Sequence, residues 1–193
     1  MPCEGVVMEQ VVMWERVDSV ALERLTLSAV NGVTLANGLV IGLTEDNQPF
    51  KVCYSVEFGK EMSRFVGGSN DDFVLIYKGH WQDQHGQPLP QYDGCTSIDI
   101  AETPFTNTLA IKQLNLKPGE SGEITVAWFQ LAQATWQPDR QRYTCIEKSA
   151  QGSVYQFEQL SSGFTTTIPF DESDLVIDYP GLFRRVYPKV SDR

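Results

Sequence analysis

Residues 50–58, with the sequence FKVCYSVEF, place a large apolar side chain at every second position and a smaller or polar one between. Because side chains point alternately to the two faces of a β-strand, this stretch predicts a strand that covers a core with one face. A second alternation, at Ile124, Val126 and Trp128, follows the turn-forming run 118–122. Both patterns indicate a chain built mainly of β-strands.

Shorter apolar runs extend the strand pattern along the rest of the chain. They are separated by pairs typical of tight turns, namely Asn31-Gly32, Asn37-Gly38, His85-Gly86 and Gln151-Gly152. We therefore expect hairpins between consecutive strands, and we interpret the run 67–72 as a further flexible turn. The shorter strands are expected at 22–29, 33–35, 39–43, 73–77, 143–146, 154–157, 164–168 and 175–178.

One window departs from the period of two and predicts a short helix within residues 104–115. Thr103-Pro104 suits a helix start, and apolar residues at helical spacing continue to the breaker Pro118-Gly119. We expect at least two of Thr103, Thr106 and Asn107 to cap backbone N–H groups at this start. Because so short a helix is marginal in water, its apolar stripe must be buried. The stripe consists of Phe105, Leu109, Ala110 and Leu114.

Two stretches carry a resemblance to a known family: DGCTSIDIAETPFTNTL at 93–109 and DYPGLFR at 178–184. A Gly-Cys pair followed by Asp and then Thr-Pro-x-Thr-Asn, with a terminal Asp-Tyr-Pro-Gly-Leu and an aromatic residue, is similar to the bacterial family named "putative glycolipid-binding proteins". The similarity runs from Trp14-Glu15-Arg16-Val17 through Ala127-Trp128 and Gln141-Arg142-Tyr143, and so covers nearly the whole chain.

The resemblance implies a spiral β-roll, in which a long, strongly curved antiparallel sheet rolls around a single short α-helix, in a protein that forms dimers. Since no linker or internal repeat divides the sequence, we expect one domain over residues 1–193. In the family pattern an aromatic residue often stands at the position of Glu102, a Pro at that of Ala110 and a Trp at that of Phe183. Glu102 is the change that bears most on ligand binding, because a carboxylate at an apolar lining position disfavours an apolar ligand unless the position faces water.

The charge balance narrows the class of partner. With 15 basic and 25 acidic residues, the chain has a formal charge of -10, which opposes binding to nucleic acid and to anionic membrane surfaces. No run approaches the roughly 20 apolar residues of a membrane-spanning helix, and the first residues do not resemble a secretory signal. We therefore expect a cytoplasmic protein with no integral membrane association.

The cysteines predict neither disulfides nor a zinc site. Cys3, Cys53, Cys95 and Cys145 are widely spaced, form no Cys-x-x-Cys pair and are accompanied by only two histidines. Because cytoplasmic thiols are normally reduced, we expect free thiols and neither a metal nor another cofactor.

The candidate catalytic groups also have ordinary structural explanations. The chain lacks the Gly-x-Ser-x-Gly elbow of many serine hydrolases. Cys95 with His80 or His85 could form a nucleophile and base, although cysteine is more often simply buried. Paired carboxylates could hydrolyse a glycoside if they converged, although acidic residues near turns more often bind backbone groups. The candidates are Asp93, Asp99, Glu102 and Asp178.

These observations favour a non-enzymatic protein that binds an amphiphilic small molecule, such as a glycolipid or another acyl-chain compound, inside the rolled sheet. Two alternatives remain open. One is a hydrolase of carbohydrates or lipid esters that uses carboxylates near Asp93, Asp99 and Asp178, and the other is a structural dimer without a ligand. The residues predicted to contact the ligand are Trp14, Asp93, Asp99, Phe105, Thr106, Asn107, Trp128, Asp178, Tyr179 and Arg184.

Overall fold

The computed structural model describes residues 9–59, 62–68, 73–77, 80–83 and 85–189. Within these ranges β-strands dominate, and the α-helical structure consists of α1 (Thr106–Leu114). Two short 3₁₀ helices, η1 (Pro90–Tyr92) and η2 (Leu131–Gln133), complete the regular elements. The predicted mainly β fold with a single short helix is confirmed.

The larger of two sheets is antiparallel throughout. Successive strands pair with each other, and the C-terminal strands return to pair with the N-terminal one. From edge to edge its nine strands are β13 (Asp178–Tyr179), β14 (Phe183–Tyr187), β1 (Glu9–Arg16), β2 (Ala21–Val30), β3 (Val33–Leu43), β4 (Pro49–Phe58), β5 (Met62–Gly68), β6 (Phe73–Tyr77) and β7 (Trp81–Gln82).

The smaller sheet contains one parallel pair of strands. From edge to edge its five strands are β12 (Phe164–Phe170), β11 (Gly152–Gln159), β10 (Thr135–Ser149), β9 (Ser121–Gln130) and β8 (Ser97–Ile100). β8 and β9 are parallel because α1 lies in the connection between them, and a crossover through a helix returns the chain in its original direction. The expected antiparallel pairing therefore holds except at this pair.

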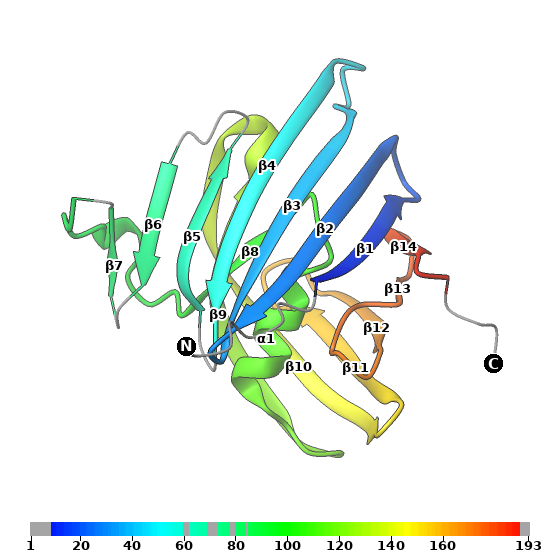
Figure 1. Cartoon of the computed structure of the whole chain (residues 1–193). Helices are drawn as coiled ribbons and strands as arrows, with labels where there is room; N and C mark the ends of the chain where they lie inside the picture. The colour runs from blue at the N-terminus through cyan, green and yellow to red at the C-terminus, as the bar shows by residue number, and fades with distance from the viewer. Residues whose placement is uncertain (1–8, 60–61, 69–72, 78–79, 84, 190–193) are drawn as a thin grey trace, which may run out of the picture.

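The two sheets meet where β12 approaches β13. An isolated antiparallel bridge joins Phe170 to Val176, and the Ile177 N–H donates to the Pro169 carbonyl at 2.9 Å. The long rolled sheet that the family resemblance implies is thus divided into two hydrogen-bonded sheets linked at this bridge. In Figure 1, α1 lies between the strands of the larger sheet and the β10–β11 hairpin of the smaller one.

The helix is buried against both sheets. Phe105, immediately before α1, and Leu109 belong to a core cluster that includes residues of β1–β4. Ala110 and Ile111 belong to a second cluster formed with β9–β12, and the half-buried Leu114 packs against that cluster. The predicted stripe is therefore buried at Phe105 and Leu109, and burial continues around the helix because a sheet lies on each side.

The predicted turn at Asn37-Gly38 is wrong, because β3 runs unbroken through both residues. Gly38 lies opposite Tyr54 of β4, and a Cβ atom at Gly38 would stand 2.1 Å from the Tyr54 ring. A glycine is therefore needed here for close packing within a strand. The predicted strand at 175–178 is also too long toward its N-terminal side, since β13 begins only at Asp178.

The predicted turns at Asn31-Gly32, His85-Gly86 and Gln151-Gly152 agree with the structure. Asn31 and Gly32 have positive φ angles of 52° and 80°, as a two-residue hairpin turn of this type requires. In the predicted turn at 67–72, the two glycines end β5, and residues 69–72 lie outside the described residues.

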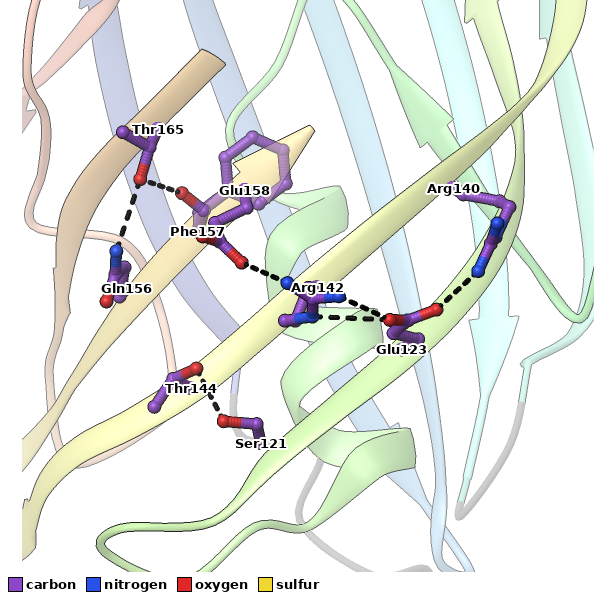
Figure 2. Close-up of polar contacts among 9 residues, drawn as sticks. All are labelled: Ser121, Glu123, Arg140, Arg142, Thr144, Gln156, Phe157, Glu158 and Thr165. Atoms are coloured by element: carbon purple, nitrogen blue, oxygen red, sulfur yellow. Dashed lines mark hydrogen bonds and ion pairs between the residues drawn. The ribbon is translucent and has the colours of Figure 1, made fainter. Parts of the chain in front are cut away.

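The outer face of the smaller sheet carries a row of cross-strand ion pairs, which Figure 2 shows. Glu123 of β9 pairs with Arg140 at 2.6 Å and with Arg142 at 2.7 Å, both on β10. Arg142 also pairs with Glu158 of β11 at 3.0 Å. Exposed pairs contribute little to stability, but they mark the face of the sheet that meets water. The opposite face is the inner one.

Candidate functional site

A cavity of about 830 Å³ lies at the inner face of the smaller sheet, and its lining includes residues of both sheets, α1 and η2. The turn between β1 and β2 contributes Ser19 and Val20, and the turn between β3 and β4 contributes Thr44 and Glu45. Small-molecule sites in proteins have volumes of this order.

One part of the lining is an aromatic wall, defined as Phe157, Phe164, Tyr179 and Phe183. Each residue comes from a different strand, from β11 to β14. The ring centroid of Tyr179 lies 6.0 Å from that of Phe157, 6.4 Å from that of Phe164 and 6.2 Å from that of Phe183. Phe164 is the most accessible of the four, with 39% of its surface exposed. The other three residues are only 4–7% exposed, so Phe164, which packs against Phe157 and Tyr179, offers most of the apolar surface that the wall presents to a ligand.

A second part of the lining is a polar floor, defined as Asp99, Asn107 and Gln141. Asp99 Oδ1 accepts a hydrogen bond from the Thr106 hydroxyl at 2.6 Å, and Asp99 Oδ2 accepts one from Gln141 Nε2 at 2.7 Å. Asn107 Oδ1 accepts a hydrogen bond from the Tyr143 hydroxyl at 2.9 Å. These bonds fix the positions of the floor side chains before any ligand arrives.

Strand register brings the floor and the wall together. Gln141 of β10 lies opposite Gln159 of β11, which lies opposite Phe164 of β12. Asp99 of β8 lies beside Trp128 of β9, another lining residue. The polar and the aromatic parts of the lining are therefore neighbours on adjacent strands.

Burial governs the charge state of the floor. It raises the pKa of Asp99, the hydrogen bonds from Thr106 and Gln141 act against this, and the negative charge of Asp139 raises the pKa further. Asp139 is itself buried and accepts the Gln141 amide at 3.4 Å. Burial, followed by the charge of Asp99, raises the pKa of Tyr179, so the Tyr179 phenol stays neutral at physiological pH.

Arg16 stands at the edge of the cavity, where it is held by three groups. Its Nε and one terminal nitrogen donate to the Asp18 carboxylate at 2.9 and 2.7 Å. The other terminal nitrogen donates to the Ala101 carbonyl at 3.1 Å. Its guanidinium carbon lies 5.0 Å from the centre of the Phe183 ring, a cation–π contact.

Glu102 lines the cavity as a buried carboxylate that is bonded to backbone. Its oxygens accept hydrogen bonds from the backbone N–H groups of Leu131 at 3.2 Å and Ala132 at 2.9 Å, both in η2. Burial raises the pKa of Glu102, and these two N–H groups counteract the rise. The carboxylate that departs from the family pattern therefore anchors η2 to the end of β8.

Comparison with known proteins identifies the family. Residues 11–185 match the family described as "Putative glycolipid-binding". The chain belongs to this family. A crystal structure of a DUF1089-family protein from Pseudomonas aeruginosa is also similar, with 32% identity, a TM-score of 0.74 and coverage of 89% of this chain and 95% of that one. A search of curated proteins finds no match.

Four of the ligand contacts predicted for this family member line the cavity: Asp99, Asn107, Trp128 and Tyr179. Two others lie directly behind the lining. Thr106 donates to Asp99, and Phe105 is fully buried in the core.

The structure places the remaining four predicted contacts away from the cavity lining. Trp14 is fully buried, and its indole N–H donates to the Val176 carbonyl at 2.8 Å. Asp93 is exposed after η1, and the exposed Arg184 pairs with Glu15. The fourth is the half-buried Asp178. Of the four candidate carboxylates for hydrolysis, Asp99 and Glu102 therefore line the cavity, and Asp93 and Asp178 do not.

Sequence reasoning missed several lining residues, including Arg16, Gln141 and Phe157. A signal for Gln141 exists in the sequence. On β10 the inward positions alternate as Asp139, Gln141, Tyr143 and Cys145, so polar residues occupy core positions at one end of an otherwise apolar face. Buried polar groups in such positions require partners, and here those partners form the floor.

The prediction that at least two of Thr103, Thr106 and Asn107 cap the helix start is wrong, since one of them, Thr103, accepts a backbone N–H there, and that N–H belongs to the N-cap residue Phe105. Thr103 Oγ1 accepts the Phe105 N–H at 3.0 Å. Thr106 instead accepts the Ile100 N–H of β8 at 3.2 Å, and Asn107 donates through Nδ2 to the Pro104 carbonyl at 3.0 Å. Capping by Thr106 and Asn107 is not needed there, because turn carbonyls already accept the N–H groups of Asn107 and Thr108.

Among the residues that the structure describes, no group of three or more His, Cys, Asp or Glu side chains could hold a metal ion. Nor does any helix in those ranges combine the length and apolarity needed to cross a bilayer. Cys53, Cys95 and Cys145 are free, and Cys3 lies outside the described residues. Burial raises the pKa of the Cys95 thiol to about 11, which disfavours the thiolate that a nucleophile would need.

A buried acid, Glu23 of β2, lies near the cavity but does not line it. The Tyr54 hydroxyl donates to Glu23 Oε1 and lies 3.2 Å from Oγ1 of Thr103, a lining residue. Burial raises the pKa of Glu23 from 4.5 to about 7, although the hydrogen bonds from Thr103 and Tyr54 lower it.

Glu23→Gln should change how stability depends on pH. The folded state holds the Glu23 proton more tightly than the unfolded state, so the wild-type protein loses stability as the pH rises from 4.5 to about 7. A shift of this size corresponds to about 3 kcal/mol. Glutamine cannot ionise, and the variant should therefore lack this decline. Denaturant unfolding at pH 5 and pH 8 measures the effect, and an equal decline in both proteins would contradict the assignment.

Proposed function

We propose that the protein binds one amphiphilic small molecule, such as a glycolipid or a related acyl-chain compound, without catalysing a reaction on it. The observation that carries this proposal is that the aromatic wall and the polar floor line the same cavity. An apolar chain would pack against Phe157, Phe164, Tyr179 and Phe183, and the headgroup would lie at Asp99, Asn107 and Gln141.

The aromatic wall and the polar floor would contribute to binding in different ways. Each methylene group that leaves water for an apolar surface contributes about 0.8 kcal/mol, so the wall favours longer chains. The floor side chains are held by Thr106, Tyr143 and one another, so a headgroup binds without the cost of ordering them. The family match over residues 11–185 supports a binding role for the whole span as one domain.

Phe164→Ala should weaken the binding of an alkyl glycoside such as octyl glucoside by roughly fivefold, about 1 kcal/mol. Phe164 lines the cavity and is already 39% exposed, so the fold should tolerate its truncation. Ile146→Ala is a matched control, because Ile146 is 52% exposed and is not a lining residue. Titration calorimetry measures both affinities. Equal affinities for Phe164→Ala and Ile146→Ala would count against the wall as the chain-binding surface.

We further propose a homodimer, as the family resemblance implies, located in the cytoplasm. Exposed apolar side chains at Leu39 and Ile41 of β3, 40% and 51% accessible, support an interface on the outer face of the larger sheet. Sedimentation equilibrium of the full chain tests the oligomeric state, and a protein that remains monomeric at high concentration would contradict it. Cell fractionation tests the compartment.

A further inference from the structure

The cavity lining carries an excess of negative charge. Among the described lining residues, Arg16 is the one basic side chain, against four carboxylates. The lining therefore repels an anionic headgroup, and this repulsion is stronger where water is excluded. The carboxylates are Asp18, Glu45, Asp99 and Glu102.

The charge of Arg16 is already paired with a carboxylate of the protein. Two of its nitrogens are bonded to Asp18 and the third to the Ala101 carbonyl, and its face covers the Phe183 ring. A guanidinium has five N–H donors, and these bonds use three of them. A phosphate, sulfate or carboxylate bound by the other two would lie beside the Asp18 carboxylate, which repels it.

The amide donors at and beside the floor are also engaged. Gln141 Nε2 donates to Asp99 and Asp139, and Gln159 Nε2 donates to Asp139 at 3.1 Å. Asn107 Nδ2 donates to the Pro104 carbonyl. Gln141 therefore directs both of its N–H groups at acceptors of the protein itself, and Gln159 and Asn107 direct one each.

Acceptor capacity remains at the floor. A carboxyl group has about four lone-pair sites when ionised and keeps acceptor capacity when protonated. Asp99 accepts side-chain hydrogen bonds from Thr106 and Gln141 and a backbone one from Ile100. A ligand placed there meets Asp99 oxygen atoms that can accept further hydrogen bonds and a Gln141 amide whose two N–H groups are both engaged. The complementary headgroup is one that donates.

We propose that the cavity selects a headgroup that donates hydrogen bonds and is uncharged or cationic, and that it excludes anionic headgroups. This inference rests on the proposed binding of an amphiphile. The shared chemistry is an O–H or N–H donor directed at Asp99, which both a hydroxyl-rich and an ammonium headgroup possess. Phosphorylated, sulfated and carboxylated amphiphiles, acidic glycolipids included, fall outside the selected class.

A series of compounds with the same octyl chain tests the selection: octyl glucoside, octylammonium, octyl sulfate and octanoate. Binding to the full-length protein is measured by calorimetry below the micelle-forming concentrations. The glucoside and the ammonium compound should each bind at least about tenfold more tightly than either anion. High salt should reduce the difference between the ammonium compound and the anions, because it screens the charges.

The outcomes separate this inference from the proposed function. Equal affinities across the series, or tighter binding of an anion, would overturn the selection and leave amphiphile binding standing. A failure of all four compounds to bind would instead overturn the proposed function. If the ammonium compound binds more tightly than the glucoside, attraction between opposite charges drives the selection, and if the glucoside binds more tightly, hydroxyl recognition drives it.

A variant pair locates the effect. Asp99→Asn should reduce the advantage of the ammonium compound over octyl sulfate several-fold, because it removes a charge from the floor. Glu172→Gln removes an exposed charge between β12 and β13, outside the lining, and should leave that ratio unchanged. Equal effects of the two substitutions would show that net charge, and not the floor, controls selection, and would overturn the assignment to Asp99.

Discussion

Arg185→Ala should lower the free energy of unfolding by about 3–5 kcal/mol, since it removes one partner of a buried ion pair. The Arg185 side chain is 3% exposed and pairs with Asp171 at 2.6 Å. It also donates to the carbonyls of Leu175 at 2.7 Å and Val176 at 2.6 Å, and its guanidinium lies over the Trp14 ring. Without the arginine, Asp171 loses its charged partner. The carbonyls of Leu175 and Val176 each lose a donor and keep one other, the Asp171 N–H and the Trp14 indole respectively.

The effect should be large because Arg185 holds the segment that links the two sheets. Val176 forms the bridge to Phe170 of β12. The residues that follow Val176 in the chain therefore connect β12 to β14. Arg184→Ala is a matched control on the adjacent residue, whose side chain is 65% exposed and pairs with Glu15. Denaturant unfolding compares the two variants. A loss of similar size at positions 184 and 185 would contradict this role for Arg185.

Phe105→Ala should cost about 3–5 kcal/mol, the range for truncating a buried aromatic side chain. Phe105 is fully buried, and its ring centroid lies 5.9 Å from that of Phe58 and 6.3 Å from that of Tyr54. These ring contacts hold the start of α1 against β4, and the helix is too short to be stable without such packing. Thermal and denaturant unfolding measure the loss.

Leu114→Ala provides the comparison for the helix. Leu114 lies at the other end of the predicted stripe and is only half-buried, so its truncation should cost distinctly less than that of Phe105. If both variants lost the same stability, the helix would be held by its general apolar character and not by the contact with β4.

The period-two pattern predicted the strands because it depends on local geometry. Residues 50–58 and the alternation at Ile124, Val126 and Trp128 lie within β4 and β9 as expected. The turn predicted at Gly38 is wrong because the role of this glycine is tertiary: a tyrosine on the next strand occupies the space where a side chain would be. The parallel pairing of β8 was also missed, because it depends on the path of the helical connection.

The sequence predicted residues of the candidate site only where they lie within a motif that resembles the family. Asp99 and Asn107 lie in the stretch that resembles the family, and both line the cavity. Trp14 shows the limit of composition, since a sequence does not distinguish an aromatic residue of the core from one that faces a ligand. Gln141 and Phe157 reach the cavity through the pairing of distant strands, which a single sequence does not specify.

Native mass spectrometry of the purified full-length protein, with octyl glucoside added below its micelle-forming concentration, tests amphiphile binding most directly. We expect one bound amphiphile per chain, either copurified or exchanged for the glucoside, and weaker retention of the glucoside by Phe164→Ala than by Ile146→Ala. A wild-type spectrum that shows only the bare chain mass, with no copurified compound and no glucoside complex, would contradict it.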